Sequence, residues 1–319
     1  MIRLGIIGAG IMGERLMRAA ESQDAVQITG VWDPSLAATR RIATELPTLP
    51  QRASAAAVIE EADCIYVASP PATHLGHARA IDAAGKALFC EKPLSVDLAD
   101  AARFMAQSGS MRAAVNFPFA SSAAVAQLRS WAAEGVVGTT QSLAITVGFA
   151  AWPRQWQHDA ASWLDGPAQG GFTREVVSHF LFLALRMLGP IRLDSASANF
   201  PEAGRSEQTI RATFTAGGVA ATLAGNVGKT NREDTNSFTI TGSAGSIRLR
   251  DWATAERLDP AGQWTAGPDP IDHQRARPLV LRRQLEAVAR MTRGEAHGLA
   301  TLQDAYDVQR VVEAILLSR

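Results

Sequence analysis

The stretch Leu4-Gly5-Ile6-Ile7-Gly8-Ala9-Gly10-Ile11-Met12-Gly13 decides the expected fold. Residues 4–7 form an apolar run typical of a buried strand, and from Ile11 onward apolar residues recur at helical spacing. Between them stands Gly-x-Gly-x-x-Gly, which in this context binds a dinucleotide, because the helix N-terminus offers free N–H groups to phosphates. The sequence therefore predicts a cofactor loop made of Gly8, Gly10, Ile11, Met12 and Gly13.

A carboxylate follows the second predicted strand. Asp33 comes directly after residues 27–32, twenty residues beyond Gly13. A carboxylate at this point can accept hydrogen bonds from both ribose hydroxyls and repels a 2′-phosphate, so it favours NAD over NADP. A glycine turn followed by a helix-capping aspartate is the structural alternative. Arg40 and Arg41, farther along the next helix, keep NADP open.

Short apolar runs alternate with helical patterns as far as Asn116. This rhythm predicts a parallel, doubly wound sheet, and we expect a dinucleotide-binding Rossmann domain over residues 1–118. The expected strands are 4–7, 27–32, 64–68, 87–90 and 113–115, and the expected helices are 11–22, 35–46, 73–84 and 97–107.

The pattern changes after Asn116, which indicates a second domain over residues 119–319. We expect an α+β domain for substrate binding and oligomerisation, with an open-faced, mostly antiparallel sheet. Its predicted helices are 122–134, 172–188, 279–293 and 302–317, and its predicted strands are 141–148, 195–199, 209–214, 219–227, 237–241 and 246–249. A long loop over residues 150–171 is typical of a functional segment.

The composition favours a small-molecule partner. Lys plus Arg equals Asp plus Glu at 31 each, so no net charge attracts nucleic acid or an anionic membrane. Cys64 and Cys90 lie inside apolar strand patterns, and no histidine or cysteine shows metal-ligand spacing, so we expect no metal. The chain shows no leader pattern and no apolar segment of about 18 residues, which predicts a soluble, cytoplasmic protein.

Two further loops fall at the carboxyl edge of the predicted sheet, where sheets of this class bind ligands. Ser69, Pro70, Pro71 and His74 follow the third strand, and Glu91-Lys92-Pro93 follows the fourth. We expect the first loop to touch the cofactor, although His74 is as readily explained by a local structural role. By position alone, Lys92 is equally well explained as a solvated surface lysine.

These residues together resemble the glucose-fructose oxidoreductase and inositol dehydrogenase (Gfo/Idh/MocA) family. The resemblance covers nearly the whole chain, and Glu91-Lys92-Pro93 at this distance from the glycine motif is its most specific part. It implies that Lys92 reaches both substrate and nicotinamide. The other matching segments are the glycine motif, the Pro70-Pro71 loop with His74, Ala84-Gly85-Lys86, Asn116, Gly170-Gly171 and the helix carrying His179, and we expect Glu91 and Asn116 to contribute to cofactor binding.

The family places an aspartate four residues before a histidine, and this sequence has Glu175 and His179. Residues four apart share a helix face, and an imidazole titrates near neutrality, so we expect His179 to be the acid/base. A core histidine is the alternative. Glu175 departs from the family aspartate, and its role stays open between holding a substrate hydroxyl, orienting His179 and pairing with an arginine.

Substrate contacts are expected from Trp152, Trp156, Trp163 and Arg174. Tryptophan faces suit the C–H surface of a sugar or cyclitol, and they suit a subunit interface equally well. The resemblance implies a homodimer or homotetramer assembled through the exposed face of the sheet.

The resulting hypothesis is an NAD(P)-dependent oxidoreductase that transfers a hydride between nicotinamide and a secondary alcohol or ketone of a sugar, cyclitol or related polyol. Lys92, His179 and Glu175 are the expected catalytic residues. Two alternatives stay open: an NAD-dependent hydrolase or lyase that oxidises its substrate transiently, and a non-catalytic NAD(H)-binding regulatory protein. Net accumulation of NADH distinguishes them.

Overall fold

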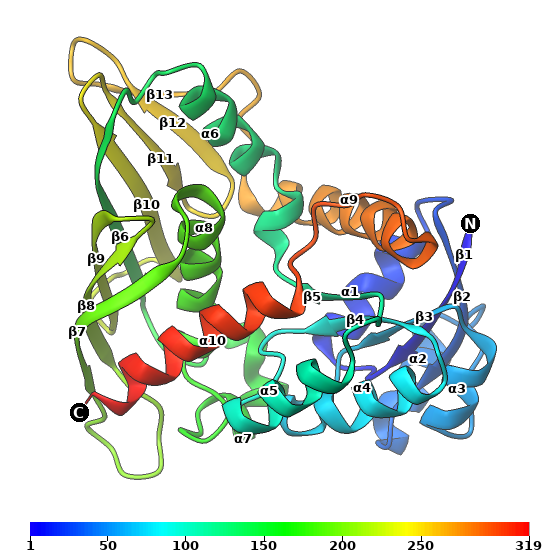
Figure 1. The fold of residues 1–319 in the computed structure, drawn as a ribbon. Coiled ribbons are helices and arrows are strands. Elements are labelled where there is room, and N and C mark those ends of the chain that lie inside the picture. Colours follow the sequence, from blue (N-terminus) through cyan, green and yellow to red (C-terminus); the bar gives the residue numbers. More distant parts are fainter. Residues whose placement is uncertain (319) are drawn as a thin grey trace. The chain divides into compact units, whose positions relative to one another are not determined.

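A computed structural model describes residues 1–318 of the chain, leaving aside the side chains of residues 158–162. The chain divides into two compact units (Figure 1). The first comprises Met1–Ala120 and Pro278–Tyr306, and the second comprises Ser121–Arg277 and Asp307–Arg319. Residue 319, the last of the predicted second domain, lies outside the described residues.

The first unit is built on a five-stranded parallel sheet in the order β2-β1-β3-β4-β5. The predicted doubly wound sheet is confirmed. The strands are β1 (Ile2–Ile7), β2 (Val26–Trp32), β3 (Cys64–Val67), β4 (Ala87–Glu91) and β5 (Ala113–Asn116), and the connecting helices are α1 (Ile11–Ala20), α2 (Leu36–Glu45), α3 (Ala55–Glu61), α4 (His74–Ala83) and α5 (Leu98–Gln107). Short 3-10 turns, Pro71–Thr73 and Pro118–Ser121, follow β3 and β5.

Helix α3 was not predicted. The run Ala55-Ala56-Ala57-Val58-Ile59 has no clear helical period, yet Ser54 caps the helix by accepting a hydrogen bond from the Ala57 N–H. The side chain of Val58 is fully buried against the sheet, where a Cβ added to Gly5 would lie 2.5 Å from it. Packing against the sheet therefore stabilises a helix that its sequence alone indicates weakly.

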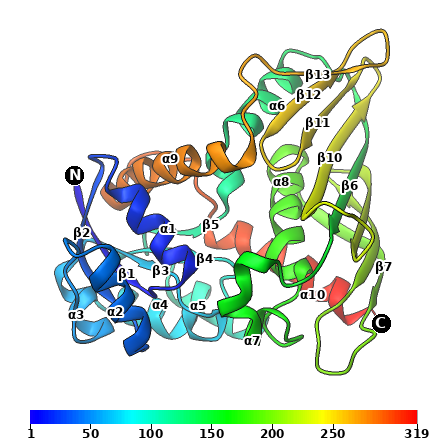
Figure 2. The ribbon, with the colours of Figure 1, turned by 180° about the vertical axis from the view of Figure 1, so that it is seen from behind.

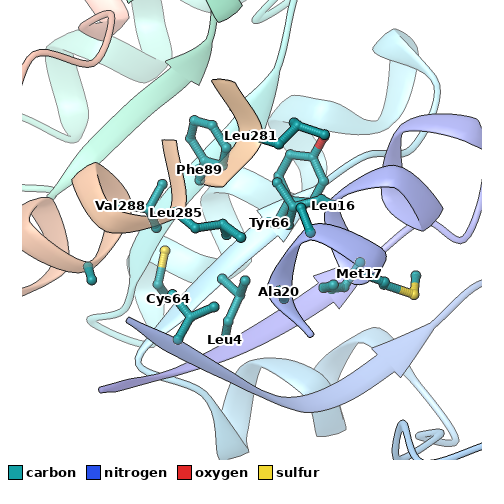
Figure 3. Packing of buried hydrophobic residues seen from close by; sticks show 14 of the residues in the cluster. Leu4, Leu16, Met17, Ala20, Cys64, Tyr66, Phe89, Leu281, Leu285 and Val288 are labelled. Atoms are coloured by element: carbon teal, nitrogen blue, oxygen red, sulfur yellow. The ribbon is translucent and has the colours of Figure 1, made fainter. Parts of the chain in front are cut away.

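Helix α9 (His273–Arg293) returns to the first unit and completes its core. Figure 3 shows Leu281, Leu285 and Val288 packed against Tyr66 and Phe89 of the sheet. In Figures 1 and 2, α1 and α9 lie on one side of this sheet and α4 and α5 on the other. The prediction of one continuous second domain over residues 119–319 was therefore wrong for Pro278–Tyr306. Helical periodicity indicates that a helix has an apolar face, but it does not indicate the sheet against which that face packs.

The second unit contains an eight-stranded sheet in the order β13-β12-β11-β10-β6-β9-β8-β7. All neighbours are antiparallel except β6 and β9, which confirms the mostly antiparallel prediction. The strands are β6 (Thr140–Phe149), β7 (Ile191–Asn199), β8 (Thr209–Ala216), β9 (Val219–Val227), β10 (Asp234–Gly242), β11 (Ser246–Arg250), β12 (Thr254–Leu258) and β13 (Trp264–Ala266). The last two were missed because they are short and carry little alternating pattern.

One face of the eight-stranded sheet is buried and the other is exposed. Along the central strands Ile145, Leu223 and Phe214 are buried, whereas their neighbours Thr146, Thr222 and Thr213 are exposed. Helix α6 (Ala123–Ala133) packs against β11 and β12, and α8 (Ser178–Leu188) packs against β8. The predicted open face is confirmed, and it carries small and hydroxyl side chains together with Arg211.

A π-helical turn, Thr173–Val177, leads into α8. Of residues 171–180, only Glu175 and His179 are not buried. The long loop before this turn contains a 3-10 segment, Gln155–Ala160, and a short helix, α7 (Ala161–Leu164). Helix α10 (Leu302–Leu317) is the last helix of the described chain. Helix α9 begins at His273, six residues before the predicted start at residue 279, and it contains Pro278.

Candidate functional site

The glycine loop of the first unit has the geometry that a dinucleotide pyrophosphate requires. Gly8 has φ +107, and a Cβ added to Gly13 would lie 2.0 Å from the Gly8 carbonyl oxygen, so neither position tolerates a side chain. A Cβ added to Gly10 would meet nothing within 4 Å, which leaves the backbone open to an approaching ligand. Gly10 is also the N-cap of α1 and offers no side-chain acceptor, so the first N–H groups of this helix are suited to phosphate oxygens.

Asp33 holds this loop in place. Its carboxylate accepts hydrogen bonds from the Ala9 N–H at 2.7 Å and the Ser35 N–H at 2.8 Å. Ser35, rather than Asp33, caps α2. Arg41 donates to the Ala9 carbonyl oxygen at 2.7 Å, so a carboxylate and a guanidinium both bind the backbone of Ala9. Each Asp33 oxygen keeps acceptor capacity, and its predicted role on the adenosine ribose stays a prediction.

His74 is fully buried and connects two loops at the carboxyl edge of the parallel sheet. Its Nδ1 lies 2.8 Å from the Pro93 carbonyl oxygen and its Nε2 lies 2.7 Å from the Ser69 carbonyl oxygen. Burial lowers the pKa of His74 to about 4, which favours the neutral ring. The two contacts favour the protonated ring instead, because a neutral imidazole donates to only one of two carbonyl oxygens. The contacts with the Pro93 and Ser69 carbonyl oxygens favour the structural alternative over the predicted contact with cofactor.

Glu91 and Asn116, both predicted to contribute to cofactor binding, join a buried hydrogen-bond network. The Glu91 carboxylate accepts from the Tyr66 hydroxyl and from Asn116 Nδ2, the latter at 2.7 Å. Asn116 Oδ1 in turn accepts from Gln284 Nε2 of α9 at 2.6 Å. Burial, followed by the Glu91 charge, raises the pKa of Tyr66 well above its usual range. The network fixes the end of β4, from which Lys92 projects.

Lys92 differs from its neighbours in exposure. Of residues 91–95 it is the only one that is not buried, and it is half-buried rather than solvated. This environment does not match the surface lysine that its position alone also permitted.

Ser69, Pro70 and Pro71 lie at the same edge, where the Ser69 hydroxyl is 2.7 Å from the Thr73 hydroxyl.

Replacement of Asn116 by alanine is expected to lower the free energy of unfolding by about 1–3 kcal/mol, because Glu91 and Gln284 each lose a buried partner. The midpoint of thermal unfolding measures this change. Asn199→Ala, at an exposed position of β7, serves as the matched control and should leave the midpoint nearly unchanged. Equal midpoints for the two variants would show that the network contributes little.

In the second unit, Glu175 and His179 lie beside an aromatic and cationic cluster. The ring of His179 meets the ring of Trp252 edge-on at 5.9 Å, and Trp252 Nε1 donates to Asp234 Oδ2 at 3.1 Å. The same Asp234 oxygen accepts from Arg154 at 3.2 Å. Burial lowers the pKa of Arg154, while Asp234, Glu233 and, last, Glu175 raise it, so Arg154 is a cation in electrostatic reach of Glu175. This supports pairing with an arginine among the roles left open for Glu175.

The predicted tryptophans have different surroundings. Trp152 is half-buried, packs edge-on against Phe149 at 5.3 Å, and donates from Nε1 to the Leu164 carbonyl oxygen at 3.3 Å. The Arg154 guanidinium lies 4.6 Å from the centre of the Trp156 ring. Trp163 is half-buried and takes part in none of the ring contacts found among the described side chains. Trp156 lies closest to Arg154 of the cluster next to His179, and the Trp152 ring contacts the same guanidinium at 5.8 Å.

Arg174 is committed to the interior and does not fit the predicted substrate contact. It is 6% exposed and forms a bidentate ion pair with Glu313, with both N···O distances at 2.7 Å. Its remaining donors reach the carbonyl oxygens of Pro167 at 2.7 Å and Gly170 at 2.9 Å. These contacts tie α10 to the loop before the π-helical turn, which is a structural role.

Sequence reasoning missed Trp252, His273 and Arg277. Trp252 and the preceding Asp251 have φ values of 72 and 45, in the left-handed region that bulky residues rarely adopt. Asp251 accepts from Arg232 at 2.8 Å and its N–H donates to the Asn236 carbonyl oxygen at 2.9 Å, so surrounding contacts hold the turn. Such outliers gather at functional sites. No glycine or motif marks this turn, and only the structure reveals it.

The fold and the glycine loop define a protein with a Rossmann unit suited to a dinucleotide and a second, α+β unit. The model for the oxidoreductase family with an NAD-binding Rossmann fold matches residues 2–116, and the model for the GFO/IDH/MocA C-terminal domain matches residues 125–248. The two ranges together cover most of the chain. The protein belongs to the GFO/IDH/MocA oxidoreductase family.

Individual relatives agree with this assignment. The chain is 36% identical over 110 residues to inositol 2-dehydrogenase 3 of Saccharopolyspora erythraea, an alignment that covers 33% of this chain and only 31% of the relative. An oxidoreductase from Agrobacterium radiobacter, solved with NAD+, L-tartaric acid and magnesium, superposes with a TM-score of 0.84 at 16% identity, over 99% of this chain and 96% of the other. An inositol dehydrogenase homolog from Azotobacter vinelandii, solved with NAD+, gives a TM-score of 0.82 at 18% identity, over 99% and 95%. These structural likenesses show the fold.

Proposed function

We propose that the protein is an NAD-dependent dehydrogenase that oxidises a secondary alcohol of a sugar, cyclitol or related polyol, or reduces the corresponding ketone. One observation carries the proposal. In two otherwise buried segments, residues 91–95 and 171–180, the side chains that are not buried are those able to move a proton or stabilise charge: Lys92, Glu175 and His179. The glycine loop and the open N-terminus of α1 support the cofactor assignment.

The cofactor, when bound, supplies the nicotinamide that exchanges hydride with the substrate carbon. The chain's own residues bind, orient and move the proton. His179 takes the hydroxyl proton as general base, and Lys92 stabilises the developing negative charge on that oxygen. Glu175, in electrostatic reach of Arg154, pairs with that arginine and thereby holds a negative charge one helical turn from His179.

The experiment is a screen of polyols, sugars and sugar acids for reduction of NAD, followed at the absorbance of NADH. A dehydrogenase accumulates NADH in proportion to the product. Turnover without accumulation would support transient oxidation by a hydrolase or lyase instead. Binding of NAD with no turnover of any substrate would support a regulatory protein.

We further propose that the protein is a cytoplasmic homodimer or homotetramer that acts on a small molecule rather than on nucleic acid or a membrane. The exposed face of the eight-stranded sheet, which carries small and hydroxyl side chains together with Arg211, supports an assembly surface. Among the described helices, none has the length and apolar character needed to cross a membrane. Light scattering tests the assembly, and a monomer at micromolar concentration would contradict it.

Asp33→Ala is expected to weaken NAD binding and to narrow the preference for NAD over NADP. The change removes an acceptor for the ribose and a repulsive charge toward the 2′-phosphate, and it also releases the Ala9 N–H that shapes the loop. Titration of wild type and variant with both cofactors measures the two effects separately. Tighter binding of NADP by the wild type would mean that Arg41, held beside the loop, dominates over Asp33.

A further inference from the structure

Two side chains in the first turns of α9 form a linked pair. His273 and Arg277 are four residues apart, and the Arg277 guanidinium lies 2.8 Å from His273 Nε2. A guanidinium can only donate, so Nε2 accepts and the imidazole proton resides on Nδ1. This hydrogen bond therefore fixes the position of the Arg277 guanidinium relative to the imidazole ring.

Aromatic faces fix both members of this pair and connect them to His179. The Arg277 guanidinium lies 5.8 Å from the centre of the Trp156 ring. His273 stacks on Trp252 at 5.5 Å with an interplanar angle of 29°, and Trp252 meets His179 edge-on at 5.9 Å. A single tryptophan thus separates His273 from the proposed acid/base, within one unit of the protein.

Among the described side chains, Arg154 has an ion-pair partner and Arg277 has none. Both guanidiniums lie over Trp156, but Arg154 forms an ion pair with Asp234 at 3.2 Å. Across the described side chains, no carboxylate lies within ion-pair distance of Arg277. Arg277 is nevertheless half-buried, and burial lowers its pKa while Asp234 and Glu233 oppose this from farther away. A partly desolvated guanidinium with spare planar donors is suited to a carboxylate.

We propose that Arg277 and His273 form a subsite for the carboxylate of the substrate, so that the enzyme acts on a polyhydroxy acid, an aldonate or uronate, rather than on a neutral polyol. The subsite rests on the proposed function, because it places the acid beside His179. The guanidinium binds the carboxylate oxygens, His273 positions the guanidinium through Nε2, and Trp252 offers a rigid apolar surface beside them. The turn over Asp251 and Trp252 is the device that presents that surface.

The test compares kcat/KM for matched acid and neutral substrates, D-glucuronate with D-glucose and D-gluconate with D-glucitol. The wild type is expected to prefer the acid of at least one pair. Arg277→Gln is expected to lower the acid-to-neutral ratio by about tenfold to a hundredfold, as for the loss of a hydrogen bond to a charged group, with the loss mainly in KM. Arg277→Lys keeps the positive charge but loses the planar set of guanidinium N–H donors, so it should give an intermediate acid-to-neutral ratio of kcat/KM.

Arg275→Gln is the matched control, because it removes the same charge from an exposed position two residues away. It should leave the ratio unchanged. A wild type that turns over neutral polyols as well as acids, with no effect of Arg277→Gln, would overturn the subsite and leave the dehydrogenase intact.

A wild type that binds NAD but oxidises no compound of either class would count against the proposed function itself. The subsite is then tested without turnover, by saturation-transfer NMR of D-glucuronate with the NAD-loaded protein. Binding that is lost in Arg277→Gln and kept in Arg275→Gln supports the subsite, and absence of binding to the wild type overturns it.

Discussion

Replacement of Lys92 by alanine is expected to lower kcat by about a hundredfold or more, as for loss of one preorganised donor that stabilises developing charge. Binding of NAD should change far less, because the glycine loop and Asp33 belong to separate loops of the first unit. Steady-state rates with the substrate identified in the screen, together with NAD titration, measure both quantities. Lys229→Ala, an exposed lysine after β9, is the control.

Near wild-type turnover in Lys92→Ala would remove this lysine from the mechanism. Loss of NAD affinity equal to the loss of rate would instead assign Lys92 to cofactor binding. A fall in kcat with NAD affinity retained is the result that supports charge stabilisation at the reacting oxygen.

His179→Ala is expected to reduce kcat by about 10²–10⁴-fold, the usual contribution of a positioned acid/base. It should also flatten the dependence of kcat on pH near neutrality, because the group that exchanges the proton is gone. The pH profile of kcat measures this, with His297→Ala at an exposed position as the control. A profile in His179→Ala that kept the wild-type shape would show that the proton leaves by another route, such as Glu175 or water.

The first unit could be predicted from the sequence because its signals are local. The glycine motif, the carboxylate after β2 and the alternation of strands and helices each lie within a short stretch of chain, and the structure confirms the sheet that they imply. The place of α9 could not be predicted, because its apolar stripe fits any uncovered face and the contact with Tyr66 and Phe89 spans about two hundred residues.

Side-chain roles were harder to predict than backbone elements. Arg174 stands next to Glu175 in the sequence, but it turns into the interior to meet Glu313, a partner that sequence spacing does not reveal. Trp252 and His273 meet only because a left-handed turn and the start of a helix converge in space. Contacts of this kind depend on the three-dimensional arrangement, and a single sequence carries no direct signal for them.

Since α9 contributes Leu281, Leu285 and Val288 to the core of the first unit, residues 1–120 cannot finish folding when they leave the ribosome. Helix α1 covers part of the side of the sheet that carries Tyr66 and Phe89, but the part beneath α9 stays uncovered until residues 278–293 have been synthesised. For most of translation the nascent protein therefore exposes an apolar face, a condition that favours aggregation and engagement by chaperones. The nucleotide-binding unit completes its core only with residues 278–306, so residues 1–120 alone are not an independent, detachable module.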